Sequence, residues 1–241
     1  MHIEEIPWVT PHELFHAFAD EPFALFLDSA TAQATHDASL HGRWSFIAVD
    51  PFETMVWRKG DESIPFSRLK ERMAELAAPA HSGLPPFAGG AAGYFGYDLG
   101  RTLEHQRAKP RAVDDQGLPD MALGFYDAVV AFDHIERRAS IVAPSEERAN
   151  ALRPRIENAT SRATTVAAKA LAFRSNFTRD GYERAVAKVV DYIHAGDIFQ
   201  ANLSQRFEAR LAAGDAPYEL YLRLREEGPA KFASFFNFGD G

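Results

Sequence analysis

The chain has 241 residues, 46% of them hydrophobic, so it can bury a substantial core in one large domain or two small ones. Its formal net charge of -8 argues against a general nucleic-acid binder, which needs a basic stripe, and the lack of Cys excludes disulfides and Cys-based metal sites. No apolar run reaches the ~20 residues of a membrane span, and the acidic N-terminus is unlike a signal peptide, so we expect a cytoplasmic protein that contacts no membrane.

The first part of the chain reads as buried strands followed by a helix. Apolar runs bounded by turn residues predict strands over 22–30, 42–51 and 54–58, and helical spacing predicts a helix over 66–76. The first strand ends in Asp28 and Ser29, so it delivers two polar groups at its C-terminal end.

Residues 89–100, GGAAGYFGYDLG, combine glycine with aromatic side chains. A phosphate cradle is one interpretation, but the spacing is not G-x-G-x-x-G and no G-K-[ST] is present. We therefore favour a buried strand whose small residues allow close packing against another layer.

The middle of the chain predicts a hairpin and then helices. Residues 121–134 and 138–143 read as two strands joined by a tight charged turn. Residues 145–171 are rich in Ala, Arg and Glu, which indicates one or two surface helices interrupted at Pro154.

Residues 178–207 carry the clearest change of period. Thr178 is placed to cap a helix, and Gly196 is placed to end it in a left-handed conformation. Apolar and polar side chains then alternate as far as Phe207, which predicts a long strand of a large sheet. The polar face of this strand either lines a cleft or meets solvent, and it consists of Gln200, Asn202, Ser204 and Arg206.

The last segments predict a helix from Pro217 to Gly228 and a strand over 229–238. That strand runs into turn residues with no partner strand after it, which is unusual for a natural domain because the edge is apolar. We therefore expect the sequence to be a fragment of a longer protein, with Phe235 to Phe238 near an unpaired edge or an empty cleft.

Residue chemistry alone indicates a soluble α+β protein with largely antiparallel sheets, because the strands come as hairpins rather than in βαβ units. The nine His show no metal-ligand spacing, and we expect His105, His134 and His194 on turns or solvated helix ends. Ser29 lies in no G-x-S-x-G elbow, so hydrolase chemistry is unsupported. Asp28 and Asp50 form a possible acid pair, although a turn is the simpler interpretation of Asp50-Pro51.

One segment, GDIFQANLSQRF at 196–207, resembles the signature of the chorismate-utilising enzymes, which include component I of anthranilate synthase and of aminodeoxychorismate synthase. Segments 27–30, 42–46, 86–100 and 118–134 resemble further segments of that family in the same order. The Ala-Asn-Leu at 201–203 resembles the aminodeoxychorismate branch, in which Val-Asn-Leu is usual.

The resemblance implies part of an α/β/β/α sandwich that is incomplete at its C-terminus. Its expected regions are an N-terminal region over 1–160, a connector over 161–176, and the start of the chorismate-binding region over 177–241. In the whole protein, chorismate exchanges its C4 hydroxyl for an amino group on the way to para-aminobenzoate and folate. A glutamine amidotransferase partner supplies the ammonia, and Mg2+ holds the carboxylate of chorismate and polarises the leaving group.

The resemblance places the family's Mg2+-binding glutamates beyond residue 241, so we name no catalytic or metal-binding residue and expect this chain alone to be inactive. Gln200, Asn202 and Ser204 are expected to shape the cleft. In several members tryptophan binds a pocket in this half, and the matching positions here are Asp28, Ser29, Arg43, Trp44, Pro229, Ala230 and Phe232. Two alternatives stay open: anthranilate synthase component I, or a non-catalytic module that binds an aromatic amino acid or docks a partner.

Overall fold

The computed structural model describes residues 1–29, 42–61, 64–76, 83–103, 114–160, 172–211 and 216–239. The chain divides into two units, one made of residues 1–165 with 221–241 and the other of residues 166–220. Every strand pairing in the described residues is antiparallel, so the α+β class with antiparallel sheets is confirmed. The expected region 177–241 is therefore shared between the two units, because residues 221–241 return to the first.

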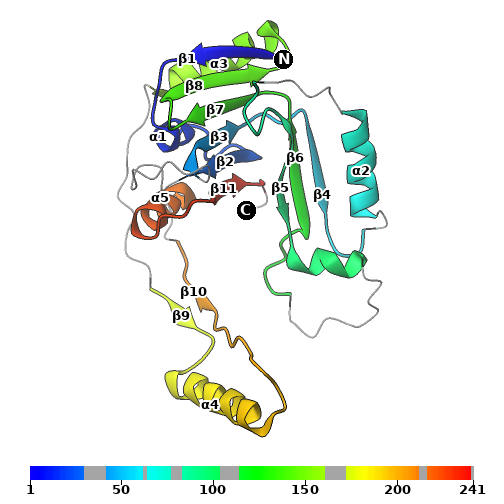
Figure 1. Ribbon diagram of the computed structural model, residues 1–241, viewed down its shortest axis with the longest axis vertical. Helices are drawn as coiled ribbons and strands as arrows, with labels where there is room; N and C mark the ends of the chain where they lie inside the picture. The colour runs from blue at the N-terminus through cyan, green and yellow to red at the C-terminus, as the bar shows by residue number, and fades with distance from the viewer. Residues whose placement is uncertain are drawn as a thin grey trace. The chain divides into compact units, whose positions relative to one another are not determined.

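A six-stranded sheet forms the centre of the first unit (Figure 1). Its order is β1-β8-β7-β3-β2-β11, and its strands are β1 (His2–Ile6), β8 (Arg138–Ala143), β7 (Val129–Asp133), β3 (Trp44–Ala48), β2 (Ala24–Asp28) and β11 (Ala233–Asn237). β7 and β8 form the predicted hairpin, in which Asp133 pairs with Arg138 across the turn. β11 pairs with β2 and ends the order, so the expectation of an edge near Phe235 is confirmed.

Two helices lie against this sheet, α1 (Pro11–Phe15) and α3 (Glu146–Thr160), and Figure 1 shows α3 beside β1 and β8. The predicted interruption at Pro154 is wrong, since α3 continues through it. Proline removes one backbone donor from a helix. The buried face of α3 compensates, because Ala149, Leu152 and Ile156 pack at helical spacing against the core.

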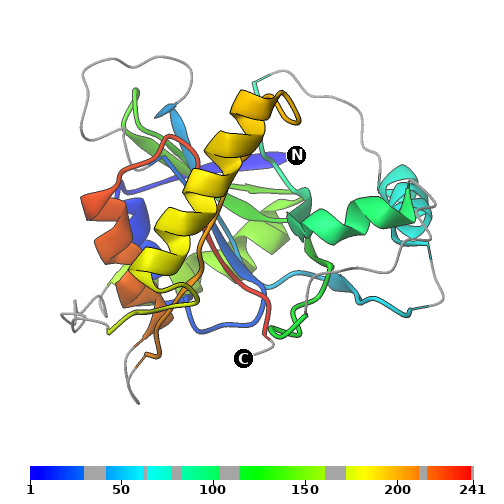
Figure 2. The same cartoon turned by 90° about the horizontal axis from the view of Figure 1, so that it is seen from below.

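A three-stranded sheet with the order β4-β6-β5 completes the strands of the first unit. Its strands are β4 (Glu53–Trp57), β6 (Met121–Tyr126) and β5 (Gly90–Phe95), and the 3-10 helix η3 (Tyr97–Thr102) follows β5. Apolar residues of the predicted helix α2 (Pro65–Glu75), including Phe66 and Leu69, pack against Met55 and Leu123 of this sheet. Figure 2 shows α2 nearly end-on at the side of the unit.

Tyr126, at the end of β6, packs into the core of the six-stranded sheet, whose other buried residues are Leu25, Phe46, Ala48, Val129, Ala131 and Val142. The three-stranded sheet has a buried cluster of its own, made of Met55, Leu99, Met121, Leu123 and Phe125. Within the glycine-rich segment, residues 90–95 form β5, which confirms a strand there, but none of them is fully buried and residues 97–100 belong to η3 instead. Gly93 of β5 lies so close to β6 that an added Cβ would meet the carbonyl oxygen of Ala122.

The single strand predicted over 121–134 is two strands in different sheets, β6 and β7. The chain changes sheet at Asp127 and Ala128, where Asp127 is the one charged residue between two buried apolar runs. Just before this point the Tyr126 hydroxyl donates a hydrogen bond of 2.6 Å to the Phe23 carbonyl. Tyr126 therefore ties the end of β6 to the start of β2.

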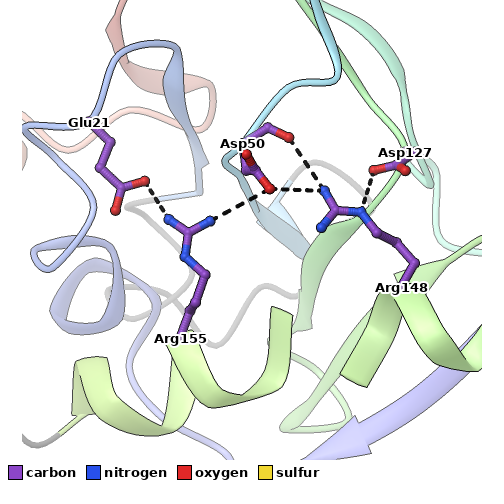
Figure 3. A network of polar contacts seen from close by, with 5 residues as sticks. All are labelled: Glu21, Asp50, Asp127, Arg148 and Arg155. Carbon is purple, nitrogen blue, oxygen red and sulfur yellow. Dashed lines mark hydrogen bonds and ion pairs between the residues drawn. The ribbon is translucent and has the colours of Figure 1, made fainter. Parts of the chain in front are cut away.

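A chain of ion pairs fastens α3 to three loops of the first unit (Figure 3). Arg148 donates to Asp127 at 2.9 Å and to Asp50 at 3.3 Å, and Arg155 donates to Glu21 at 2.5 Å and lies 3.9 Å from Asp50. Asp50 adopts a positive φ of 57°, as in a tight turn, and its carboxylate faces arginine. The turn interpretation of Asp50-Pro51 is thereby confirmed, and Asp28 has different partners, described below.

Arg148 is the member of this chain that binds both Asp127 and Asp50, and Arg148→Met is expected to lower the free energy of unfolding by about 1–2 kcal/mol. Methionine keeps the apolar stem but removes the donors that hold the passage from β6 to β7 at Asp127. Urea denaturation followed by circular dichroism measures the change. The matched control is Arg179→Met, which removes an exposed helix pair with Glu183 and should leave the midpoint unchanged. Equal midpoints for both variants would contradict the role of Arg148.

The second unit contains one helix and a short pair of strands, α4 (Arg179–Ala195), β9 (Arg174–Ser175) and β10 (Phe207–Glu208). The Thr178 side chain accepts a hydrogen bond from the Gly181 N–H, and Gly196 ends α4 in the left-handed conformation with φ 81°. Both predicted helix ends are confirmed. Most of the expected connector, residues 161–171, lies outside the described residues.

The long strand predicted up to Phe207 is wrong in this structure. Only Phe207 and Glu208 form a strand, which pairs with β9. Residues 197–206, between α4 and this strand, pair with no other described strand. An alternating sequence becomes a strand only when a neighbour accepts and donates its backbone hydrogen bonds. The second unit supplies such a neighbour for two residues only.

Candidate functional site

The strand order brings together the three segments that the resemblance assigned to a tryptophan-like pocket. β2 lies between β3 and β11, so the residues at the end of β2 neighbour the start of β3 and the start of β11. Asp28 pairs with Ala233, and Ser29 follows directly. Arg43 and Trp44 begin β3, while residues 229–232 lead from α5 (Pro217–Glu227) into β11.

The Asp28 carboxylate is turned toward α5 and is fully engaged. Arg225 donates to it at 2.6 Å through Nε, and the Tyr221 hydroxyl donates at 2.9 Å. The side chains of Asp28 and Arg225 are only 1% and 8% exposed. Burial, together with the negative charge of Asp28, raises the pKa of Tyr221. Asp28 therefore fastens α5 to the sheet, and this interaction occupies the carboxylate that was expected to contact a ligand.

Ser29 joins the three segments through its backbone and its hydroxyl. Its hydroxyl donates to the Trp44 carbonyl at 2.7 Å and lies 3.5 Å from the Lys231 carbonyl oxygen. Its N–H donates to the Ser45 hydroxyl at 3.1 Å. The hydroxyl oxygen of Ser29 and the carbonyl oxygens of Trp44 and Lys231, all three of them able to accept hydrogen bonds, thus converge at the end of β2. A convergence of acceptors suits a cationic group such as an ammonium.

Arg43 is held at the start of β3 by Asp133. Nε and Nη2 of Arg43 both donate to one oxygen of Asp133, at 2.9 Å and 2.5 Å, and the guanidinium lies 5.1 Å from the centre of the Trp44 ring. Burial alone would raise the pKa of Asp133, but hydrogen bonds from Arg43 and from the backbone N–H of Glu136 and Ile135 outweigh it and lower that pKa. Arg43 therefore positions Trp44, whose ring also stacks on Phe46.

A cavity of about 440 Å³ opens beside Arg43 and Trp44, on the face of the six-stranded sheet that carries the Trp44 side chain. Ala131 and Val142 form part of its floor, and Asp133, Glu136 and Arg138 bring charges to its walls. The volume lies in the range of small-molecule sites. The cavity is lined by β1, β3, β7, β8 and residues 83–85, and none of residues 229–232 borders it.

The remaining predicted site residues are exposed. Pro229 and Ala230 are exposed, and the Phe232 ring is 81% exposed, so Phe232 is not packed into a pocket wall. Gln200, Asn202 and Ser204 are exposed members of the second unit, outside any strand. Within the described ranges no group of three or more His, Asp or Glu is placed to hold a metal ion.

Sequence reasoning missed the partners of the predicted residues. Tyr221 and Arg225 lie one helical turn apart on α5, so they share a face and bind the Asp28 carboxylate together. Ser45, fully buried, contacts the Nε2 atom of His134 at 2.8 Å. The polar residue Ser45 inside the apolar strand run 44–48 was the one local signal of this contact.

His134 follows β7 at the predicted turn, and its side chain is partly buried rather than solvated. His194 is exposed in the last turn of α4, as expected, and His105 lies outside the described residues. Burial lowers the pKa of His134, with the charges of Asp28 and Asp133 opposing and that of Arg225 reinforcing the shift. Burial and Arg225 likewise lower the pKa of His12.

These histidines predict that stability falls on mild acidification. A histidine whose folded-state pKa lies below 6.5 stays neutral in the folded chain while the unfolded chain binds a proton. The contribution of this neutral histidine to the free energy of unfolding is fully present above about pH 6.5 and is lost as the pH falls below that value. We expect the free energy of unfolding to decrease between about pH 7 and pH 5.

The double variant His12→Gln/His134→Gln should flatten this dependence, and urea denaturation at several pH values measures it. The matched control is His194→Gln, which removes an exposed histidine and should leave the slope unchanged. Parallel curves for the double variant and the parent chain would contradict the assignment to His12 and His134.

The fold agrees with comparisons to known proteins. The chorismate binding enzyme family matches over residues 23–241, and the chain belongs to this family. A crystal structure of anthranilate synthase component I from Streptococcus pneumoniae superposes with a TM-score of 0.67 at 26% identity, covering 86% of this chain and 50% of that one. In the described parts of the chain, no helix is long and apolar enough to cross a membrane.

Two kinds of relative are similarly close. Anthranilate synthase component 1 of Pseudomonas aeruginosa is 33% identical over 96% of this chain and 52% of its own length. Aminodeoxychorismate synthase component 1 is 31% identical in Klebsiella aerogenes and 30% identical in Escherichia coli, over 94% and 99% of this chain. The chain spans about half the length of these relatives.

Proposed function

We propose that the whole protein to which these residues belong is component I of aminodeoxychorismate synthase. The observation that carries the proposal is the family match over 23–241. The branch is supported by Ala-Asn-Leu at 201–203 and by the Gly-Gly-Ala-Ala-Gly segment, which forms β5 and the turn before it. Anthranilate synthase component I is the alternative member, since both kinds of relative match at about the same identity.

In the proposed reaction the C4 hydroxyl of chorismate leaves as water and ammonia adds, which gives 4-amino-4-deoxychorismate. A glutamine amidotransferase partner would supply the ammonia. Bound Mg2+ would polarise the departing hydroxyl. The described residues contain no cluster that fits this ion. The contribution of this chain would be to shape the cleft, with Gln200, Asn202 and Ser204 on the signature segment.

Product analysis of the whole protein distinguishes the two branches. Incubation with chorismate, Mg2+ and ammonium should yield 4-amino-4-deoxychorismate without pyruvate. Anthranilate together with pyruvate would overturn the assignment in favour of anthranilate synthase. The 241-residue chain by itself is expected to convert no chorismate under the same conditions, and turnover by it would contradict the expectation that the catalytic groups lie elsewhere.

A second candidate function is the binding of an aromatic amino acid such as tryptophan at the end of β2. Its support is the convergence of the Ser29 hydroxyl with the carbonyl oxygens of Trp44 and Lys231, which suits an ammonium group. Calorimetry of the chain with tryptophan tests it. Ser29→Ala should abolish the heat of binding, whereas Ser140→Ala, in the neighbouring cavity, should leave it unchanged. No heat at millimolar tryptophan would overturn this candidate.

A further inference from the structure

A buried chain of hydrogen bonds connects the end of β2 to the histidine that follows β7. The N–H of Ser29 donates to the Ser45 hydroxyl at 3.1 Å, and that hydroxyl lies 2.8 Å from Nε2 of His134. Ser45 is fully buried, so bulk water replaces neither partner. At its other end the chain reaches the Ser29 site, meaning the Ser29 hydroxyl with the carbonyl oxygens of Trp44 and Lys231.

The donors and acceptors of Ser45 determine the direction of its hydrogen bond with His134. A hydroxyl carries one proton and two lone pairs, and one lone pair of Ser45 accepts the Ser29 N–H. Within the described residues, the one further hydrogen-bond partner of the Ser45 side chain is Nε2 of His134. The hydroxyl proton needs this nitrogen as its acceptor, because buried polar groups are almost always hydrogen-bonded. The network therefore assigns to His134 the neutral tautomer with its proton on Nδ1.

Protonation of His134 would change Nε2 from an acceptor into a donor. The Ser45 hydroxyl would then face two donors, and its own proton would lose its acceptor inside the core, which is costly. Relief requires the Ser45 side chain to rotate toward another acceptor, and that rotation breaks the bond from the Ser29 N–H. We propose that neutral His134 positions the Ser29 site through Ser45, and that a proton taken up by His134 releases the end of β2.

The charged groups around His134 come from three elements. Asp28 of β2 and Asp133 of β7 favour its protonated form, and Arg225 of α5 opposes it. Burial acts more strongly than these charges and lowers the pKa of His134, so the imidazole is neutral at about pH 7. From the N-terminal segment, the ring of Trp8 packs edge-on against the imidazole at a centre-to-centre distance of 5.7 Å and adds no charge.

Further ionisable side chains contact these neighbours, namely Arg43 on Asp133, Arg137 over the Trp8 ring and Tyr221 on Asp28. His12 of α1 is a second histidine whose pKa burial and Arg225 lower. In the described part of the chain it makes no hydrogen bond with Ser45. His12 therefore shares the electrostatic surroundings of His134 but not its hydrogen bonds, which makes it the matched control.

Nitrogen-15 NMR of the 241-residue chain labelled at histidine measures the tautomer. At about pH 7.5, Nε2 of His134 should have the chemical shift of an unprotonated imidazole nitrogen and Nδ1 that of a protonated one. His134→Gln identifies the signals by their loss. A proton on Nε2 at this pH would overturn the proposal.

The amide proton of Ser29 reports the release of β2 in the folded chain. Between about pH 7.5 and pH 5 its signal should move upfield, because the hydrogen bond to Ser45 is lost, and it should titrate together with the imidazole of His134. Ser45→Ala should show the upfield position at every pH. The titration should disappear in His134→Gln, whose amide oxygen accepts from Ser45 at every pH, and should persist in His12→Gln. A Ser29 signal that does not titrate, or that still titrates in His134→Gln, would overturn the proposal.

The consequence for a ligand rests on the second candidate function, the binding of an aromatic amino acid at the Ser29 site. Calorimetry should show tryptophan bound at least about tenfold more weakly at about pH 5 than at about pH 7.5, although tryptophan keeps its charges over this range. His134→Gln should lose this difference, and His12→Gln should keep it. Binding of equal strength at both pH values would overturn the control of the site by His134. Absence of heat at both would overturn the second candidate function, while the NMR titration still decides the proposal.

Discussion

Replacing Arg225 with Met is expected to lower the free energy of unfolding by about 3–5 kcal/mol. Arg225 is the only described cation that donates to Asp28, and the Asp28 side chain is 1% exposed. Removal of Arg225 leaves a carboxylate in the sheet with only the Tyr221 hydroxyl as a side-chain donor. Urea denaturation followed by circular dichroism measures the loss.

The double variant Asp28→Asn/Arg225→Met is the control for this reasoning. It removes both charges, so it should recover a large part of the stability that the single variant loses. Tyr221→Phe removes one hydrogen bond and should cost about 1 kcal/mol. If the double variant were less stable than Arg225→Met, the cost would come from lost packing and not from an uncompensated charge.

Gly93→Ala is expected to cost more than about 4 kcal/mol or to prevent folding. An added Cβ would lie 2.0 Å from the carbonyl oxygen of Ala122, which is backbone of the paired strand and cannot turn away. The φ of 153° at Gly93 is also one that L-residues rarely adopt. Thermal unfolding of the purified variant, or its loss from the soluble fraction, measures the effect.

The matched control is Gly100→Ala in η3, where an added Cβ meets nothing within 4 Å. This change should alter the unfolding temperature by no more than a few degrees. Together the two variants separate the close approach of β5 to β6 from a general cost of replacing glycine in the segment 89–100. Comparable losses at Gly93 and Gly100 would contradict the role of that approach.

Predictions from local pattern succeeded where neighbours in the sequence supply the stabilising groups. The ends of α4 are set by Thr178 and Gly196, each of which acts on backbone groups within a few residues. The β7–β8 hairpin likewise depends on a tight charged turn between two largely apolar runs. Such features are visible in sequence because their partners lie within one window.

The failures share a different cause. Asp127 is the one charged residue between the apolar runs of β6 and β7, and it marks where the chain leaves one sheet for the other, but a single charged residue does not by itself predict a break between two strands. The stretch 199–206 alternates as a strand does, but alternation supplies no partner. Pro154 was weighted as a helix breaker, and the buried face of α3 offset its local cost.

The sequence by itself determined the antiparallel class, the ends of α4, the β7–β8 hairpin and the resemblance to chorismate-utilising enzymes. Only the tertiary structure decided that β11 pairs beside β2, and that Asp28 binds Arg225, which is 197 residues away in sequence. The physical reason is the distance along the sequence over which each kind of interaction acts. Propensity, capping and turn chemistry act over a few residues, whereas strand partners and buried charges are chosen by the whole packed core.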